Sequence, residues 1–384
     1  MPRVLVTGGA GYIGSHACKA LARAGHEPIV YDSMEAGFHG FVKWGPLEIG
    51  DVRDASRLSA VLRQYEPDAV MHFAAYIAAG ESVTNPQKYH DNNVVGSRTL
   101  LDAMRGTGVS TLVFSSTASV YGNPQTTPIR EDHPCNPTSP YAETKLIVER
   151  MLADAGAQDA LRWAALRYFN AAGADPEGEL GECHDPETHL IPLAIRAALG
   201  LSEPLRIFGD DYKTPDGTAI RDYIHVSDLA TAHVAALEHL LGGGDSAAMN
   251  LGVGVGHSVN DVIATVERVL GKPVPRSIAG RRPGDPRESV ADARLAAERL
   301  AWRPQLTDLE TIVRTAAAWE GRRVAEIAAL NGTKSGETEN RRNGFRFLDS
   351  EKPPRPDTAR RRRGQDLPSG ETPPRTNPSR ADLP

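Results

Sequence analysis

Apolar residues follow two alternating patterns over the first 170 positions. Short runs rich in β-branched residues predict strands, and between them apolar residues return about every 3.6 positions, the period of a helix with one buried face. The predicted strands are residues 4–7, 28–32, 68–73, 110–115 and 161–168, and the predicted helices are residues 13–25, 55–65, 92–106 and 140–155. This alternation predicts right-handed βαβ units, and so an α/β fold with a doubly wound parallel sheet covered on both faces.

Beyond residue 170 the pattern loosens into loops rich in Gly, Pro and Asp. Shorter helices are predicted at residues 190–199, 227–241 and 258–270, and short strands at 205–208 and 249–251. We expect a smaller α/β lobe over residues 171–330, interleaved with the domain of residues 1–170. It would pack beside the carboxyl edge of the sheet, where open α/β sheets bind their ligands.

The segment from residue 331 to 384 differs in composition. It holds eight of the 28 prolines, twelve Lys or Arg against eight Asp or Glu, four consecutive arginines at 360–363 and almost no aliphatic residues. Such a segment cannot bury enough apolar surface to offset the entropy of ordering, so we expect a disordered tail. We interpret the arginine run as a solvated extension in preference to a polyanion-binding arm.

Charge and hydropathy narrow the class of protein. The net charge is -6, and without the tail the chain carries 31 basic and 41 acidic residues, which argues against nucleic acid as a partner. Mean hydropathy is -0.37, and no apolar stretch reaches the roughly 18 residues of a membrane helix. The chain shows no signal-peptide pattern, and its cysteines (Cys18, Cys135, Cys183) share no metal-ligand spacing. We therefore expect a cytoplasmic protein.

A glycine-rich turn joins the first predicted strand to the first helix. Its glycines, Gly8, Gly11 and Gly14, allow respectively the tight turn, the approach of a pyrophosphate to the backbone and close packing of helix on strand. Asp32 ends the second strand, where a carboxylate accepts both ribose hydroxyls and repels a 2′-phosphate. The first 170 residues are therefore predicted to be a Rossmann domain that binds NAD in preference to NADP.

Candidate catalytic groups lie on the fourth predicted helix and after the strand that precedes it. Tyr141 and Lys145 are four positions apart on a predicted helix that Pro140 begins, so their side chains share one face. An ammonium near a phenol favours the phenolate and lowers its pKa, which makes a tyrosine usable as a base. Hydroxyl residues around Thr117 end a strand at the same edge. With the nucleotide site, this arrangement predicts hydride chemistry at a carbinol carbon.

These motifs resemble the extended short-chain dehydrogenase/reductases. Further motifs make the chain similar to the UDP-glucose 4-epimerases of that family over about residues 1–330. They are His72-Phe73-Ala74-Ala75, Gly80-Glu81-Ser82, Asp91-Asn92-Asn93-Val94, Leu166-Arg167-Tyr168-Phe169-Asn170, Phe208-Gly209-Asp210-Asp211-Tyr212, Asp216-Gly217-Thr218 and Arg221-Asp222-Tyr223-Ile224-His225-Val226.

The resemblance implies an NAD-dependent isomerase of nucleotide-sugar metabolism. Tyr141, helped by Thr117 and Lys145, would take the proton of the sugar's 4-hydroxyl while the hydride at carbon 4 passes to tightly bound NAD. The 4-keto sugar would then turn its other face and receive the hydride back, which interconverts UDP-galactose and UDP-glucose.

The resemblance also implies binding residues and an assembly. For the cofactor they are Gly8, Gly11, Tyr12, Ile13, Gly14, Asp32, Asp51, Val52, Phe73, Ala74, Ala75, Asn92, Thr117, Tyr141, Lys145 and Phe169. For the substrate they are Thr117, Asn170, His189, Leu190, Arg221, Arg282, Asp285 and Ser289, with the arginines on the diphosphate and Asp285 on the uridine ribose. A homodimer through helices 92–106 and 140–155 is implied as well.

Three positions depart from the family pattern. Ile77 stands where many members have a lysine on the nicotinamide ribose, which predicts looser cofactor retention. Thr188-His189 replaces a pair of asparagines, so His189 is either a uridine contact or a histidine of the helix cap region. Ser289 replaces a bulky tyrosine of some members, and we hypothesise that it leaves room for an N-acetyl group, so that UDP-GlcNAc and UDP-GalNAc are interconverted too. We expect no metal, because Cys183, His184 and His189 are loosely spaced.

Other functions are open or disfavoured on the residues. A 4,6-dehydratase needs an acid pair after the hydroxyl residue, and Ala118-Ser119 follow Thr117 instead. A UDP-xylose/UDP-arabinose 4-epimerase remains an alternative, because the motifs report chemistry at carbon 4 and not at carbon 6. An NAD-sensing protein without catalysis would be expected to lack the pair formed by Tyr141 and Lys145.

Overall fold

The structure, a computed structural model, describes residues 1–282 and 284–333. The predicted disordered tail, 331–384, lies outside the described residues except for its first three, which end helix α11 (Leu309–Thr333). No helix among the described residues is both long and apolar enough to cross a membrane.

A seven-stranded parallel sheet forms the main body of the described chain. Its order is β10-β6-β5-β4-β1-β2-β3. In register, Thr7 at the end of β1 pairs with Tyr31 on β2 and with His72 on β4, so three strands end at one edge. The strands are β1 (Arg3–Thr7), β2 (Glu27–Asp32), β3 (Leu47–Ile49), β4 (Ala69–His72), β5 (Thr111–Ser115), β6 (Arg162–Tyr168) and β10 (Ala247–Leu251).

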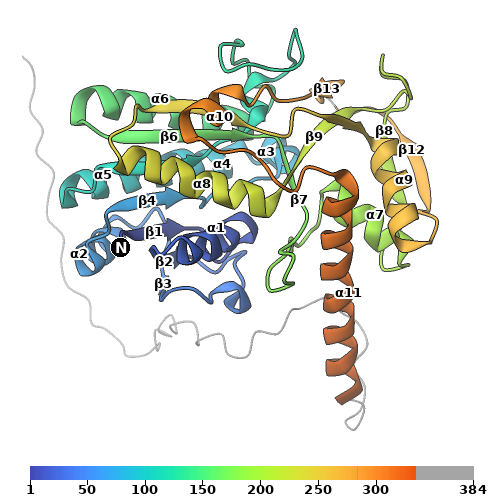
Figure 1. The fold of residues 1–384 in the computed structure, drawn as a ribbon, viewed down its shortest axis with the longest axis horizontal. Coiled ribbons are helices and arrows are strands. Elements are labelled where there is room, and N and C mark those ends of the chain that lie inside the picture. Colours follow the sequence, from blue (N-terminus) through green and yellow to red (C-terminus); the bar gives the residue numbers. More distant parts are fainter. Residues whose placement is uncertain (283, 334–384) are drawn as a thin grey trace, which may run out of the picture. The chain divides into compact units, whose positions relative to one another are not determined.

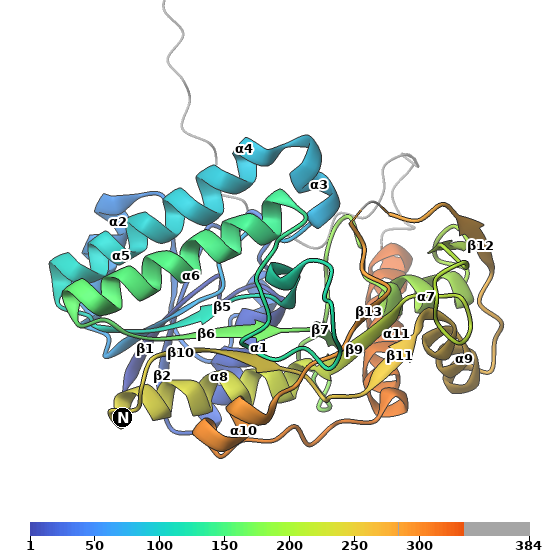
Figure 2. The same ribbon diagram turned by 90° about the horizontal axis from the view of Figure 1, so that it is seen from above.

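Helices cover both faces of this sheet, and each helix packs its apolar side against one of the two faces. Figure 2 shows α5 and α6 on one side of the sheet and α8 and α10 on the other. One face carries α1 (Tyr12–Arg23), α8 (Val226–Leu241) and α10 (Arg294–Leu300), and the other carries α2 (Ala55–Tyr65), α5 (Gly96–Thr107) and α6 (Pro140–Asp159). The predicted fold class, a doubly wound Rossmann sheet, is confirmed.

A smaller lobe lies beyond the carboxyl ends of the strands (Figure 1). Strand β9 (Ile220–His225) pairs with β7 (Asn170–Ala172), β11 (Gly256–Ser258) and β13 (Glu288–Ser289), and β8 (Leu205–Phe208) pairs with β12 (Arg276–Ala279). Helices α7 (Leu190–Ala198), α9 (Val259–Leu270) and α11 enclose its apolar core. The strand pairs place Asn170, Arg221 and Ser289 on neighbouring strands.

Short helical turns join the strand ends to the longer helices near this lobe. They are η1 (His39–Phe41), α3 (Ala79–Thr84), α4 (Pro86–Tyr89), η2 (His90–Val95) and η3 (Ala118–Tyr121). The predicted helix 92–106 is therefore not one regular helix: its beginning belongs to η2, a π-helical turn, and α5 follows.

The structure corrects the placement of two predicted elements. The helix predicted at 227–241 is α8 and the strand predicted at 249–251 lies in β10, and both belong to the main sheet rather than to the lobe. Met249 of β10 pairs with Leu166 of β6 in parallel. The chain leaves the sheet after β6, contributes strands to the lobe and returns through α8, because a parallel partner for β6 requires such a crossover.

Candidate active site

The predicted cofactor and catalytic residues gather at the carboxyl ends of β1, β4, β5 and β6. The turn after β1 lies against the segment after β4: a Cβ on Gly8 would stand 2.6 Å from the backbone nitrogen of Ala74. Ser115 at the end of β5 hydrogen-bonds the Tyr168 hydroxyl on β6 at 2.6 Å. Residues from four separate segments thus share one edge of the sheet.

The glycine turn has the conformation that the spacing predicts. Gly8 has φ +70°, in the left-handed region that favours glycine. A Cβ on Gly14 would lie 2.2 Å from the Gly8 carbonyl oxygen, so only glycine lets α1 begin this close to the turn. Gly11 caps α1 without a side-chain hydrogen bond. The first amides of the helix are therefore available to an anionic group such as a pyrophosphate.

Asp32 is buried beside this turn with its carboxylate held by backbone amides. Its oxygens accept hydrogen bonds from the Ala10 amide at 3.0 Å and the Met34 amide at 2.9 Å, while burial raises its pKa. The position fits a ribose-binding acid. At the next strand end, Asp51 is paired with Arg53 at 2.9 and 3.1 Å, which lowers the Asp51 pKa, and Val52 beside it is buried.

Tyr141 and Thr117 meet at the start of α6, as predicted. The Ser139 hydroxyl caps this helix by accepting a hydrogen bond from the Ala142 amide at 3.3 Å, and Tyr141 follows directly inside it. Tyr141 is only 8% exposed. Burial raises its pKa well above the ordinary value, and a hydrogen bond with Thr117 acts in the opposite direction.

Lys145 lies one turn after Tyr141 on α6, and its environment corrects one expectation. Burial lowers the pKa of Lys145 to about 7, and its ammonium donates a hydrogen bond to the Ser115 carbonyl oxygen at 2.8 Å. The sequence predicted that Lys145 lowers the Tyr141 pKa. In the structure the Tyr141 pKa is raised, because desolvation of the phenol outweighs every other influence on it.

A buried ion pair near Lys145, between Arg167 and Glu149, was not predicted from the sequence. Arg167 on β6 reaches Glu149 on α6 with its Nε 3.0 and 3.1 Å from the two carboxylate oxygens. Arg167 also donates to the Tyr121 hydroxyl at 2.9 Å. Glu149 is the charged neighbour that raises the Lys145 pKa against burial. Its position four residues after Lys145 on one helix face was the signal that could have identified it.

The segment after β4 is held by an asparagine that the sequence did not single out. Asn93 accepts a hydrogen bond from the Tyr76 amide at 2.9 Å and donates to the Tyr76 carbonyl at 3.0 Å and to the Thr144 hydroxyl at 3.1 Å. The predicted residue, Asn92, donates to Asn93 at 3.1 Å. Phe73 packs on the His233 ring, with centroids 4.8 Å apart. Asn93 therefore fixes the wall to which Asn92 belongs.

Guanidinium groups converge on the lobe side. Arg282 lies over the Phe208 ring at 3.9 Å, and Arg206 lies near the same ring at 5.2 Å. Arg221 pairs with Asp285. Arg206 was not predicted, although it stands two residues before Phe208 on β8, so that both side chains lie on one face of that strand. Two positive groups around one ring, with Arg221 nearby on β9, make an environment suited to a diphosphate.

Asn170 and Ser289 complete this side of the site. The Asn170 amide donates a hydrogen bond to the Asp222 carbonyl oxygen at 3.0 Å, which fixes β7 against β9. Ser289 on β13 pairs in register with Arg221 on β9. Both predicted residues are therefore brought close to the arginine cluster.

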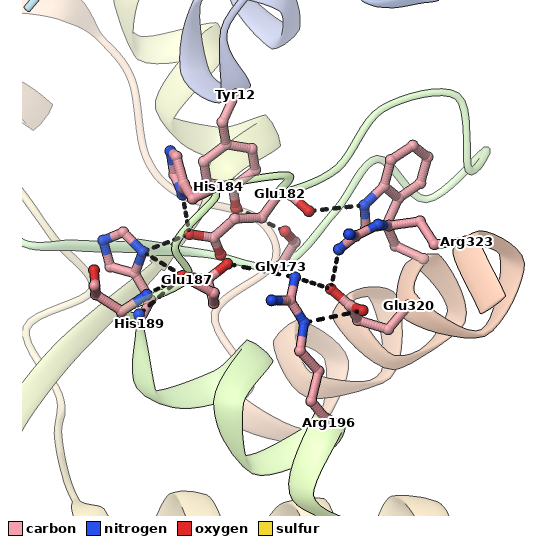
Figure 3. A network of polar contacts seen from close by, with 11 residues as sticks. Tyr12, Gly173, Glu182, His184, Glu187, His189, Arg196, Glu320 and Arg323 are labelled. Carbon is pink, nitrogen blue, oxygen red and sulfur yellow. Dashed lines mark hydrogen bonds and ion pairs between the residues drawn. The ribbon is translucent and has the colours of Figure 1, made fainter. Parts of the chain in front are cut away.

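His189 is the N-cap residue of α7, so it lies in the cap region of that helix, and its role as a uridine contact stays a prediction. Its side chain makes no cap hydrogen bond to α7, which begins at Leu190. Instead its Nδ1 lies 2.7 Å from Glu182 and 3.0 Å from Glu187 (Figure 3). The two carboxylates outweigh burial and raise the pKa of His189 to about 10.

Fold and site together define a Rossmann-type enzyme with a nucleotide site and a Tyr–Lys pair at one sheet edge. A sequence model of the NAD dependent epimerase/dehydratase family matches residues 4–252, and the protein belongs to this family.

Relatives within the family are UDP-glucose 4-epimerases. That of Rhizobium leguminosarum bv. trifolii is 52% identical over 319 residues, which are 83% of this chain and 97% of the relative. The structure of UDP-glucose 4-epimerase from Brucella ovis in complex with NAD is 52% identical, with a TM-score of 0.81 over 83% of this chain and 98% of that one. The enzyme from Stenotrophomonas maltophila, with bound NAD and formylated UDP-arabinopyranose, is 42% identical, with a TM-score of 0.82 over 85% and 100%.

These comparisons confirm the predicted resemblance to UDP-glucose 4-epimerases and the prediction of NAD as cofactor. The roles of the individual site residues and the domain boundary at residue 170 stay predictions.

Proposed function

We propose that the protein is a UDP-glucose 4-epimerase, an NAD-dependent isomerase that interconverts UDP-galactose and UDP-glucose through a 4-keto sugar. The observation that carries this proposal is that Tyr141 meets Thr117, with Lys145 one turn further along α6, at the edge where the glycine turn also lies. The relative from Rhizobium leguminosarum, 52% identical over 97% of its length, carries this activity in its name and supports the assignment.

The described residues fit NAD. The uncapped start of α1 offers backbone amides to a pyrophosphate, and the buried oxygens of Asp32 are acceptors for ribose hydroxyls. Bound NAD supplies a reversible hydride acceptor for carbon 4 of the sugar, and its positive charge favours ionised groups nearby. Asp51, Val52, Phe73, Asn92 and Phe169 would line the rest of the cofactor site.

The chain's own groups supply the acid and base. Tyr141 in its phenolate form would take the proton of the sugar's 4-hydroxyl and later return it. Thr117 holds the phenolic oxygen by a hydrogen bond. The Lys145 ammonium, one turn along the same helix, would stabilise negative charge on that oxygen. Arg221 and Arg282 would hold the diphosphate with Asn170, so that the sugar alone is free to turn over between the two half-reactions.

The first experiment incubates purified protein with UDP-galactose and no added NAD, followed by chromatography of the sugar nucleotides. Formation of UDP-glucose to equilibrium identifies an epimerase with resident NAD. If product appears only when NAD is supplied, the chemistry stands and the cofactor exchanges, as Ile77 predicts. Tyr141→Phe should keep the fold and lower the epimerisation rate about 100-fold or more. In a protein that only senses NAD, the substitution should leave function unchanged.

A pentose substrate is the second candidate. The relative from Stenotrophomonas maltophila was solved with formylated UDP-arabinopyranose, a nucleotide sugar without a hexose. If UDP-galactose gives no product with or without NAD, the hexose assignment is wrong. UDP-xylose is then the substrate to try, and its conversion to UDP-arabinose would establish a pentose 4-epimerase.

Ser289 is proposed to widen the substrate range. Ser289 lies on β13 in register with Arg221 on β9. Its small side chain would leave room for an N-acetyl group at carbon 2 of the sugar. We expect Ser289→Tyr to lower the rate on UDP-GlcNAc relative to UDP-glucose by about tenfold or more, because the ring would fill that space. Rates with both substrates measure the ratio, and a ratio unchanged by the substitution contradicts the hypothesis.

We further propose a cytoplasmic homodimer. Val95, at 43% exposure, lies within the predicted helix 92–106 of the bundle, and Val83, at 64%, lies on α3, which packs against α6. An interface would cover both side chains. Light scattering should give twice the chain mass of 41.3 kDa, and Val95→Glu should shift the protein toward monomer. A monomeric mass for the unaltered protein contradicts this assembly.

A further inference from the structure

Four potential metal ligands cluster on the loop between β7 and α7. Glu182, His184, Glu187 and His189 each offer one ligand atom, and these atoms all lie within 4.8 Å of one another. Figure 3 shows the two imidazoles and the two carboxylates turned toward a common point. Cys183, which lies between Glu182 and His184 in the sequence, is not part of this cluster. It packs instead with Phe41 and Leu180.

Three of the separations between these atoms are somewhat shorter than those in a tetrahedral metal site. Nδ1 of His184 lies 2.9 Å and Nδ1 of His189 lies 2.7 Å from one oxygen of Glu182. Nδ1 of His189 lies 3.0 Å from Glu187. Zinc bonds of about 2.0–2.1 Å place tetrahedral ligands about 3.3 Å apart. Side-chain movements of a few tenths of an ångström therefore suffice to admit the ion.

Burial and charge add a second argument. The side chains of Glu182 and Glu187 are 6% and 1% exposed. The second carboxylate oxygen of Glu187 has no hydrogen-bond partner among the described residues, and Arg196 lies 3.7 Å from it while engaged with Glu320. A buried carboxylate oxygen without a hydrogen bond is costly, and the charge of a cation bound by the Glu187 carboxylate would offset part of that cost.

We propose that Glu182, His184, Glu187 and His189 bind one Zn²⁺ ion as a closed structural site. Two imidazole ligands favour zinc over Mg²⁺ or Ca²⁺, which prefer oxygen ligands alone. The half-exposed rings of His184 and His189 give the ion a path from solvent. The site ties the loop to the start of α7 and to α1, where the Tyr12 ring lies edge-on to His184 at 6.1 Å.

The test measures zinc binding by the full chain after removal of metals with a chelator. No histidine or cysteine occurs beyond His257, so residues 331–384 add no competing ligand of those types. Titration calorimetry should show one Zn²⁺ per chain with sub-micromolar affinity, with proton release that varies between buffers. The midpoint of thermal unfolding should rise with zinc, and metal analysis should find zinc retained after gel filtration.

Matched variants decide where the ion binds. His184→Ala and Glu182→Gln should each weaken zinc binding at least about tenfold, whereas His90→Ala, a substitution of an exposed histidine on η2, should not. Cobalt in place of zinc should show no thiolate charge-transfer band. Absence of stoichiometric binding, or binding unchanged in both His184→Ala and Glu182→Gln, overturns the proposal. The cluster would then be an imidazolium–carboxylate network.

Discussion

Lys145 and Glu149 lie one turn apart on α6, and both are buried. Burial lowers the Lys145 pKa to about 7, and the negative charge of Glu149 opposes a further fall. Arg167 holds Glu149 in place through the contacts at 3.0 and 3.1 Å. Glu149 therefore acts on the reaction through Lys145, which makes it a positioning residue and not a catalytic one.

Glu149→Gln removes this charge while keeping the side chain's shape. We expect less of Lys145 to be protonated at pH 7, so that kcat falls about tenfold and the alkaline limb of the kcat profile moves to lower pH. The pH dependence of kcat with UDP-galactose measures both effects. Glu143→Gln changes an exposed acid on the first turn of the same helix and should leave the profile unaltered.

Stability must be separated from this electrostatic effect. Glu149→Gln leaves Arg167 charged and buried without its partner, which costs about 3–5 kcal/mol of unfolding free energy. The double variant Glu149→Leu with Arg167→Met removes both charges and should recover most of that loss while keeping the shifted profile. A double variant with the profile of the unaltered enzyme would contradict a role for the Glu149 charge.

At the scale of elements, the turn between β1 and α1 is tightly constrained by its own backbone. A Cβ on Gly14 would stand 2.2 Å from the Gly8 carbonyl oxygen and 3.0 Å from the Gly9 Cα, both backbone atoms that cannot rotate away. Any larger residue at position 14 must therefore move the turn itself. The same turn presents the amides on which cofactor binding depends.

Gly14→Ala should lower NAD affinity by about tenfold or more, because the turn shifts away from the pyrophosphate position. Fluorescence or calorimetric titration of cofactor-stripped protein measures this change. Gly106→Ala is the matched control, since Gly106 lies on α5 with no atom within 4 Å of its added Cβ. It should leave NAD binding unchanged and make the helix slightly more stable. Equal NAD affinity in Gly14→Ala and the unaltered protein would contradict this account.

Most strands of the main sheet could be predicted from the sequence, but the sheet that each strand joins could not. Local pattern was enough for β1, β2, β4, β5 and β6, because each is a short apolar run between clear breaks. Pattern does not say which sheet a strand joins, and β10 was placed in the lobe because its partner β6 lies about eighty residues earlier. The π-helical turn η2 nearly keeps the 3.6-residue spacing of apolar residues, so the sequence pattern did not distinguish it from an α-helix.

In the site, too, residues within a local motif could be predicted, and residues with distant partners could not. Gly8 and Asp32 could be found because their spacing lies within one βαβ unit. Asn93 could not, since it acquires its contact with Thr144 from far away in the sequence. Glu149, four residues after Lys145, and Glu182, two residues before His184, had local signals that the prediction did not use. Asn93 meets Thr144 only when η2 packs on α6, and that packing is not encoded in any local motif.

At the scale of the whole molecule, four histidines in the described part of the chain are buried, and burial lowers the pKa of each. Burial lowers the pKa of His72 to about 3 and the pKa values of His16, His225 and His233 to about 4. An unfolded histidine has a pKa near about 6.5. The folded protein therefore holds these rings neutral at pH 5, where the unfolded chain binds protons on them.

Because the unfolded state takes up more protons between about pH 6.5 and 4, the free energy of unfolding falls as pH falls through this window. Each ring contributes about 2 kcal/mol of that loss between pH 7 and 5. Urea unfolding at both pH values measures it. His233→Gln replaces a ring that donates to the Leu229 carbonyl at 2.8 Å and should reduce the loss by one ring's share. His90→Ala, on the surface, should not, and an undiminished loss in His233→Gln would contradict the assignment of a neutral buried ring.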